Sequence, residues 1–297
     1  MSSFSIGFDD LAHSELPQAL KISRIIKTKS ESKVVTKDDS QSITELMHHF
    51  DEPFFDTSAL PMSIVSALAK QSVKVVLSGD GGDELFRGYS WYDNYELIIK
   101  KPKLPGYKYF QYLAKKSLLL KNSFLDRSIK YILRNYFLKG FELYSVLLGG
   151  AYSFEKASFR KRYNIPKNYD DYWFFNKHLK KDLPLHQSLR YLDFKTYLVC
   201  DILQKVDMMS MRHSIECRVP LLSTKIIEFA FKLPKEKLVG SYGNKQIMKS
   251  LLAKSIPISI IKSKKKGFSI PQRSWKKIVK IGSNYLIDDV LKWEQKA

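Results

Sequence analysis

One segment limits the fold of this chain more than any other: an apolar run that ends in a glycine-rich acidic loop. The run is VKVVL at residues 73–77, and the loop is SGDGGDE at residues 78–84. Short runs rich in β-branched apolar residues are typical of buried parallel strands. Three glycines in the loop let the backbone turn tightly and approach a ligand closely. The pattern therefore predicts a buried parallel strand, a tight turn and then the start of a helix.

The segments before this run alternate between strand and helix patterns. Phe4, Ile6 and Phe8 lie two residues apart, which predicts a strand over 3–8. The other expected elements are a helix over 14–27, a strand over 33–36, a helix from 39 or 40 to about 50, and a helix over 58–71 capped by Ser58. Strands that alternate with helices predict an α/β fold with a parallel sheet and right-handed crossovers.

The pattern changes after Trp91. Residues 91–190 have helical periodicity, aromatic and basic side chains and no clear strand, and further helices are expected near 193–213, 224–231 and 244–256. No internal repeat or low-complexity linker separates these segments. The prediction is one continuous domain over 1–297, with an α/β part at 1–90 and a mainly helical part at 91–297.

The charge is strongly positive, with 50 basic and 30 acidic residues and a net charge of +20. A nucleic-acid partner is one reading of such a charge, and salt-sensitive retention on DNA or RNA would support it. The lysines are widely spread and no nucleic-acid-binding motif accompanies them, so a solvated basic surface is the favoured interpretation. The N-terminus lacks a signal-peptide pattern, and no apolar run reaches the roughly 20 residues that span a bilayer. These features predict a soluble, cytoplasmic protein in which Cys200 and Cys217 are free, buried thiols.

The glycine-rich loop carries the strongest chemical signal. Its backbone suits an anion such as a phosphate, yet its three acidic residues would repel a bare phosphate. A divalent cation between carboxylate and phosphate, as Mg²⁺ binds in nucleotide enzymes, removes the conflict. The alternatives are an acidic surface turn or a Ca²⁺ loop, but a Ca²⁺ loop needs a further carboxylate at a fixed spacing that this sequence lacks.

Several motifs in the same order make the chain resemble the synthetase domain of glutamine-hydrolysing asparagine synthetases. The segment from Ser78 to Tyr89 is similar to the family's SGDGGDELFxGY run. The other matching motifs are DEPF at 51–54, SALP at 58–61, DIL at 201–203, KVD at 205–207, RVP at 218–220 and KKGF at 265–268. The resemblance runs from about Phe4 to about Lys276 and is weakest between 91 and 190.

The resemblance implies an ATP pyrophosphatase-like core that binds Mg-ATP. Members adenylate the side-chain carboxylate of aspartate, release pyrophosphate and let ammonia displace AMP. By position, Ile6 matches the residue that packs against adenine, and Ser78 and Gly79 match residues that contact the nucleotide. Asp83 matches a Mg²⁺ ligand. The implied cofactors are therefore ATP and Mg²⁺, and the implied small substrates are aspartate and ammonia.

Three positions match catalytic residues of the family. Asp80 matches an acid needed to form the acyl-adenylate, Glu216 an active-site acid beside the reacting carboxyl, and Lys265 a lysine that stabilises developing negative charge. Taken alone, Glu216 and Arg218 are as well explained by an internal ion pair, and residues 264–266 by a solvated basic loop.

The chain also departs from the family pattern. Ser2 follows Met1 where the family's glutaminase domain has a cysteine, and the SGGxDS loop that should precede Phe4 is not found there. Met208 stands where the family usually has Arg or Lys. These departures predict a fragment whose activity alone is impaired, with a separate glutaminase or N-terminal polypeptide as a partner. Amidation of another carboxylate, such as a surface-sugar acid, and a non-catalytic remnant remain open alternatives.

Overall fold

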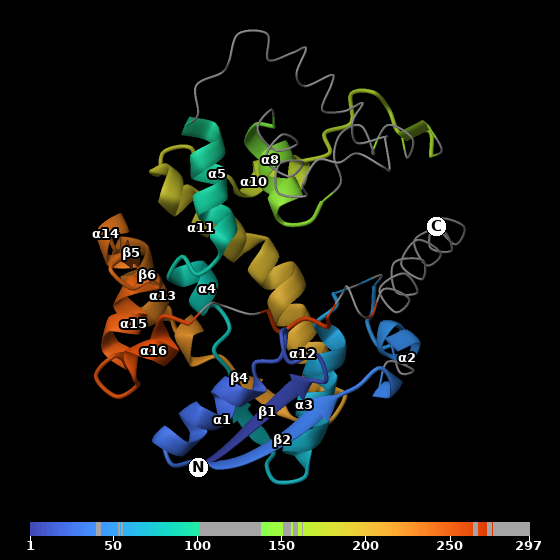
Figure 1. The fold of residues 1–297 in the computed structure, drawn as a ribbon. Coiled ribbons are helices and arrows are strands. Elements are labelled where there is room, and N and C mark those ends of the chain that lie inside the picture. Colours follow the sequence, from blue (N-terminus) through green and yellow to red (C-terminus); the bar gives the residue numbers. More distant parts are fainter. Residues whose placement is uncertain are drawn as a thin grey trace, which may run out of the picture. The chain divides into compact units, whose positions relative to one another are not determined.

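The computed structural model describes residues 1–39, 43–52, 54, 56–100, 138–150, 156, 160–161, 163–263, 267–271 and 275. The chain divides into two compact units. The first, unit 1, combines residues 1–86 with 197–297, and the second, unit 2, consists of residues 87–196. Figure 1 shows the elements in sequence colours.

Unit 1 contains all the strands that the structure describes. Its first part holds β1 (Ser2–Phe8), α1 (Leu16–Ile25), β2 (Lys29–Val35), α2 (Ile43–His48), α3 (Ala59–Lys70), β3 (Val75–Leu77) and α4 (Gly82–Leu85). Its second part holds the π-helix η2 (Leu198–Leu203), α12 (Gln204–Met211), β4 (Glu216–Arg218), the 3₁₀ turn η3 (Pro220–Leu222), α13 (Thr224–Lys232), α14 (Lys235–Leu238), β5 (Val239–Gly240), β6 (Gly243–Asn244), α15 (Gln246–Leu252) and α16 (Ile258–Ile261).

The strands of unit 1 pair in twos. β1 pairs in parallel with β2 in the register Ser2 to Lys29, and β3 pairs in parallel with β4 in the register Val75 to Glu216. β5 and β6 form a small antiparallel pair. The mixed α/β class and the parallel pairing are confirmed, whereas the described strands form three two-stranded sheets rather than one.

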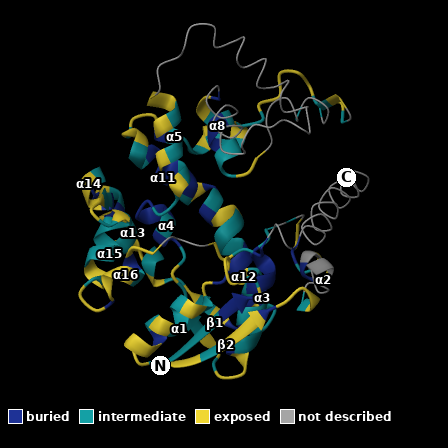
Figure 2. Cartoon of the chain, in the orientation of Figure 1, coloured by how far each residue is buried: buried dark blue, intermediate teal, exposed yellow. Residues whose placement is uncertain are grey.

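The core of unit 1 lies where α3 packs against β1 and β2 (Figure 2). The predicted strand is present, but burial does not alternate along it: Ile6 and Phe8 are 7% and 5% exposed, Gly7 between them is buried too, and Phe4 is only partly buried. The apolar partners of Ile6 and Phe8 in this core are Val35, Leu46, Phe50, Ala59, Leu60, Met209, Ile270 and Trp275. Apolar side chains from distant segments thus hold β1 and α3 together.

Unit 2 is helical in the part that the structure describes, as the sequence predicts for 91–190. Its helices are α5 (Ser90–Lys100), α8 (Gly140–Leu147), α10 (Trp173–His178) and α11 (Leu185–Lys195). Tyr92, Tyr144, Leu189 and Leu192 form its core. Burial raises the pKa of the Asp193 carboxyl to about 6, although Tyr144 and Trp91 donate hydrogen bonds to it. These bonds satisfy an acid that would otherwise be costly to bury.

Two predictions of the sequence are wrong in detail. The strand at 75–77 is not buried, because Val75 and Leu77 border a cavity and are 40% and 62% exposed. Ser58 precedes α3, but its side chain does not cap the helix. Its hydroxyl donates to Asp56 Oδ2 at 2.7 Å instead, so the aspartate holds the start of α3.

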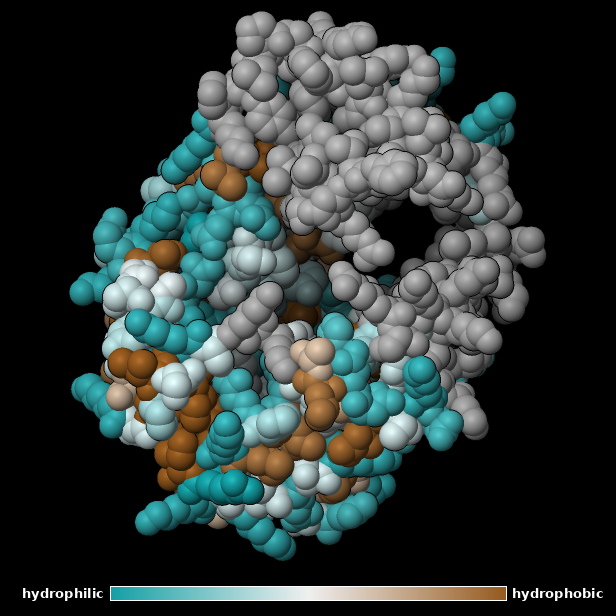
Figure 3. Space-filling model, viewed as in Figure 1, coloured by the Kyte–Doolittle hydropathy of each residue, from teal (hydrophilic) through white to brown (hydrophobic). Residues whose placement is uncertain are grey.

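The surface mixes charged and apolar residues. On the face drawn in Figure 3, apolar patches lie among hydrophilic ones in the lower part of the view, where Figure 1 draws α1 and β2. Ile26 and Val34, which belong to this region of the chain, are 50% and 47% exposed. Within the described residues, none of the helices combines the length and the hydropathy that a membrane crossing needs.

Candidate active site

The predicted glycine-rich loop follows β3 directly and leads into α4. The amide of Ser78 donates to Arg218 O at 2.9 Å, so the β3–β4 ladder reaches the first loop residue. Gly81 then adopts a left-handed backbone with φ of 81°, and a Cβ there would lie 2.2 Å from Leu222 Cδ2. Glycine is required at this position both for the φ angle and for the close approach of η3.

A hydrogen bond within the loop holds the Asp80 side chain, whereas the space beside Gly79 is unoccupied. The hydroxyl of Ser78 donates to Asp80 Oδ2 at 2.6 Å. A Cβ on Gly79 would meet no other atom within 4 Å. Three of the predicted site residues therefore lie together, with free space beside the backbone of one of them.

Asp83, the predicted metal ligand, stands in the first turn of α4 and faces a lysine. Lys245 Nζ lies 2.9 Å from Asp83 Oδ1, and both side chains are about one-quarter exposed. Lys245 precedes α15 and has a left-handed backbone with φ of 60°, which is uncommon for a residue with a side chain. Sequence reasoning missed Lys245, because it is far from the loop in sequence and no motif marks it.

Glu216 begins β4 and pairs with Arg218. Their Oε1 and Nε atoms are 2.7 Å apart, and the side chains are 56% and 62% exposed. The hydrogen bond from Arg218, together with its charge, holds the pKa of Glu216 below its ordinary value. The ion-pair alternative is thus realised, although on the surface rather than in the interior.

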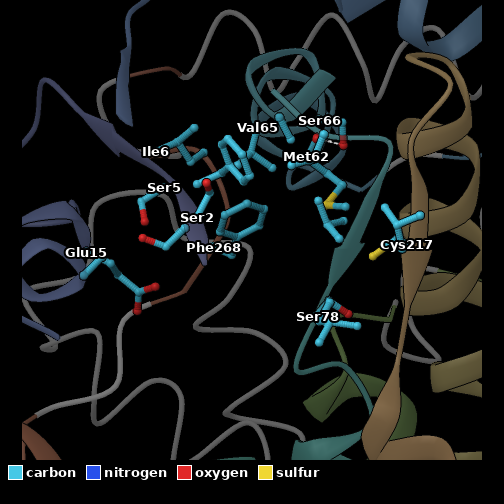
Figure 4. Close-up of a pocket in the computed structure, with 18 of the residues that line it drawn as sticks. Ser2, Ser5, Ile6, Glu15, Met62, Val65, Ser66, Ser78, Cys217 and Phe268 are labelled. Carbon is cyan, nitrogen blue, oxygen red and sulfur yellow. Dashed lines mark hydrogen bonds between the residues drawn. The ribbon is translucent and has the colours of Figure 1, made fainter. Parts of the chain in front are cut away.

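A cavity of about 630 Å³ joins two of the predicted nucleotide-binding residues. Ile6 lines it from β1 and Ser78 from the end of β3 (Figure 4). Cys217 of β4 lines it as well, and it is partly rather than fully buried, while Cys200 is exposed. Both thiols are free, but the prediction that they are buried is wrong because each lies beside open space.

The predicted lysine of the site lies outside the described residues. Lys265 belongs to the segment 264–266, so its position stays a prediction. Gly267 and Phe268, which follow it, line the cavity. The described chain therefore lines the cavity again from Gly267 to Phe268.

The residues present suit a divalent cation completed by other ligands. In the described part of the chain, no three His, Cys, Asp or Glu side chains form a ready metal site. Mg²⁺ is usually held by one or two protein carboxylates, with phosphate oxygens and water as the other ligands. Asp83 is the carboxylate that the sequence predicts for this role, and in the structure its Oδ1 pairs with the ammonium of Lys245.

A buried ionic cluster lies under the loop before α3. Lys205 Nζ contacts Asp56 Oδ2 at 2.5 Å, and the lysine side chain is 7% exposed. Burial alone would raise the pKa of the Asp56 carboxyl. The charge and the hydrogen bond of Lys205 act in the opposite direction, and the pKa lies below its ordinary value. Burial and the charge of Asp56 raise the pKa of Asp201 to about 7. In the sequence, Asp201 and Lys205 belong to matching motifs without a role, and Asp56 is not singled out, because the contacts of these residues join distant segments.

Comparisons with known proteins agree with the motifs. The family model described as asparagine synthase matches residues 1–292. A glutamine-hydrolysing asparagine synthetase of Bacillus subtilis is 30% identical over 290 residues, which are 93% of this chain and 43% of that protein. A putative asparagine synthetase of Mycobacterium bovis is 29% identical over 92% of this chain and 41% of its own length. One from Methanocaldococcus jannaschii is 31% identical over 71% of this chain and 40% of its own length. The chain thus spans less than half the length of these curated relatives.

Proposed function

This chain belongs to the asparagine synthase family, and we propose that it binds Mg-ATP, adenylates the side-chain carboxylate of aspartate and gives the acyl-adenylate to ammonia. The proposal includes an ATP pyrophosphatase-like core, with residues 1–90 as its nucleotide-binding part and 91–297 as a mainly helical part. It also includes glutamine as the ultimate nitrogen source, supplied through a glutaminase partner.

The nucleotide is assigned to the cavity between β1 and β3. Ile6 offers an apolar side chain to the adenine ring, and Ser78 and Gly79 offer a hydroxyl and an open stretch of backbone. Asp83 holds Mg²⁺, which draws negative charge from the phosphates when it is bound. Asp80, whose carboxylate accepts the hydroxyl of Ser78, is assigned to orient the reacting groups.

The reaction takes two balanced steps. An aspartate carboxylate oxygen attacks the α-phosphorus, and the bond to pyrophosphate breaks with its electrons on the leaving oxygen. Ammonia then attacks the acyl carbon, loses a proton and expels AMP. Glu216 is assigned to the ammonia step and Lys265 to the charge on the leaving groups. Preorganised charges of this kind typically supply a large part of catalysis.

One observation supports this function most. Ile6 and Ser78, assigned to the two ends of one nucleotide, come from strands far apart in sequence and line the same cavity. A solvated acidic turn, the simpler reading of the loop, gives no reason for that convergence.

The test is an assay of purified chain with ATP, Mg²⁺, aspartate and ammonium. Pyrophosphate and asparagine are expected to form in equal amounts, and Asp80→Asn is expected to abolish both. Asp38→Asn, which changes an exposed carboxylate after β2, serves as the control and keeps the wild-type rate. Aspartate-dependent release of pyrophosphate without asparagine would contradict the ammonia step, and absence of both products would contradict the proposed activity for this chain.

A further inference from the structure

Two carboxylates and one lysine meet inside unit 1, and the proposed reaction gives them no role. Lys205 Nζ lies 2.5 Å from Asp56 Oδ2, and the lysine side chain is 7% exposed. Asp201, four residues before Lys205, lies beside the carboxyl of Asp56. Its Oδ1 atom is buried and has no hydrogen-bond partner among the described residues. Two acids therefore share one ammonium group, and the three side chains form an acid–lysine cluster.

The helix that carries Asp201 and Lys205 brings them to the start of α3. Asp201 belongs to the π-helix η2, and Lys205 lies in the first turn of α12, which follows η2 directly. π-helical turns are rare and are frequent at functional sites. Met209 lies four residues after Lys205 and so on the same side of α12. It packs in the core that also holds Ala59 and Leu60 of α3. The charged and the apolar contacts of α12 thus reach the same place.

Asp56 fixes the turn from which α3 begins. Its Oδ1 accepts the amide of Ser58 at 2.8 Å, and its Oδ2 accepts the hydroxyl of Ser58 at 2.7 Å. Thr57, between these two residues, accepts the amide of Ile270 with its carbonyl oxygen at 3.4 Å. Ile270 is 1% exposed and packs in the same core as Ala59. The turn that Asp56 holds therefore supports the chain at Ile270.

The chain before Ile270 leads to the nucleotide cavity. Gly267 and Phe268, three and two residues before Ile270, line that cavity (Figure 4). Phe268 is 42% exposed, so its ring borders open space. A shift of Ile270 would move this ring relative to the cavity, because one residue separates them in sequence. The cluster is thus connected to the site by a backbone hydrogen bond and a short piece of chain.

We propose that the acid–lysine cluster is a positioning device, which sets the place of Phe268 in the wall of the nucleotide cavity through the contact of Thr57 with Ile270. The cluster holds the turn firmly while Asp201 is protonated, because the ammonium group then pairs with one carboxylate. When Asp201 loses its proton, two negative groups compete for that ammonium and repel each other. The effect on the nucleotide rests on the proposed function, whereas the support of Ile270 does not.

The surroundings of Asp201 place this proton near neutral pH. Burial and the charge of Asp56 raise the pKa of Asp201 to about 7, and the charge of Lys205 opposes them. Cys200, the neighbour of Asp201 on η2, stays a thiol, because burial and the charges of Glu52 and Asp201 raise its pKa. The groups that control Asp201 therefore come from the turn before α3 and from α12.

Hydrogen exchange at the amide of Ile270 tests the support without any nucleotide. Wild type and Asp201→Asn are compared with each other at about pH 5.5 and again at about pH 8, so the intrinsic exchange rate is the same within each comparison. They should exchange equally at the lower pH, where Asp201 is protonated and as neutral as asparagine. At the higher pH the wild type should exchange about tenfold faster, since weakening a hydrogen bond to a charged group changes a local equilibrium by about that factor.

The amide of Ser78, which donates to Arg218 O, is the internal control for general loosening of unit 1. It should exchange at the same rate in wild type and Asp201→Asn at each pH. The contrast between the amides of Ile270 and Ser78 separates a positioning role from a general contribution to stability.

Lys205→Met tests the consequence for the nucleotide. This variant should exchange faster at Ile270 at both pH values. It should also bind Mg-ATP about three- to tenfold more weakly, because Phe268 loses part of an apolar contact. Lys33→Met is the matched control, since that lysine pairs with Asp39 at the surface, and it should change neither quantity.

Equal exchange at Ile270 in wild type and Asp201→Asn at about pH 8 would overturn the proposal. Parallel changes at Ile270 and Ser78 would overturn it as well, because the cluster would then stabilise unit 1 as a whole. Unchanged Mg-ATP affinity in Lys205→Met would show that the cluster does not position the cavity wall. A wild type that binds no Mg-ATP would contradict the proposed function instead, and the exchange rates would still decide whether the cluster supports Ile270.

Discussion

The ammonium of Lys245 lies 2.9 Å from the carboxylate of Asp83, where a cation bound by the loop would also have to lie. The lysine reaches this place from a left-handed backbone position, and such strain is often found at functional sites. If Asp83 binds Mg²⁺ as proposed, Lys245 and the metal ion compete for the same carboxylate.

Lys245→Met should strengthen binding of a divalent cation in the absence of nucleotide. The ion pair is partly exposed, and such pairs typically contribute about 0.2–1 kcal/mol, so the gain should be about 1.4- to fivefold. Binding of Mn²⁺, a spectroscopic substitute for Mg²⁺, measures it directly. Lys249→Met is the control, because that ammonium donates to Tyr242 O rather than to Asp83. Equal affinities for wild type and Lys245→Met would show that the pair does not compete with metal.

The same substitution at two glycines of the loop should have opposite consequences. Gly81→Ala should lower the free energy of unfolding by about 1–3 kcal/mol, since the added methyl meets Leu222 at a left-handed position. Gly79→Ala should leave the midpoint of thermal unfolding nearly unchanged, because its methyl enters open space, but should weaken ATP binding. Calorimetric unfolding and ATP titrations separate the two effects. Equal loss of stability in both variants would contradict the described loop geometry.

Breaking the buried pair between Lys205 and Asp56 should destabilise unit 1. Lys205→Met leaves the Asp56 carboxylate without its ammonium partner, and removing one member of a buried pair typically costs about 3 kcal/mol or more. The double variant with Asp56→Asn should recover a large part of this loss, which urea denaturation would show. A double variant no more stable than Lys205→Met alone would argue against direct coupling.

The raised pKa of Asp201 predicts how stability depends on pH. The ordinary pKa is 3.8 and the folded pKa is about 7, so the folded state holds this proton more tightly than the unfolded state between these values. Its contribution to stability is present below pH 4 and is lost as pH rises through 7. Asp201→Asn should therefore gain stability relative to wild type between pH 5 and 8, as measured by thermal unfolding at each pH. A difference between the two proteins that stays constant over this range would refute the assignment.

Local sequence patterns predicted where several helices and strands lie. Burial and most side-chain partners depend on contacts between distant segments. The apolar residues Ile6 and Phe8 predicted the position of β1, because both belong to the core that also holds Ala59 and Leu60 of α3. The motif at 78–84 predicted the position of the loop, because the left-handed backbone at Gly81 favours glycine over other residues. The predicted cap at Ser58 was wrong for a local reason, because Asp56, two residues before it, accepts the hydrogen bond of its hydroxyl.

The misjudged burial of β3 has a similar cause. The apolar run at 75–77 has the composition of a central strand, yet its exposure depends on what lies beside it in space. The Lys245 contact to Asp83 and the pair between Lys205 and Asp56 also join distant segments. Contacts between distant residues produce no periodic pattern that can be recognised in a single sequence.

Binding of ATP to the purified chain, measured by calorimetry with and without Mg²⁺, tests the central claim most directly. The account predicts one Mg²⁺-dependent site per chain, lost in Asp83→Asn and retained in Asp38→Asn, with all three proteins unfolding at similar temperatures. Absence of ATP binding to the folded wild type, or binding that neither Mg²⁺ nor Asp83→Asn alters, would contradict it.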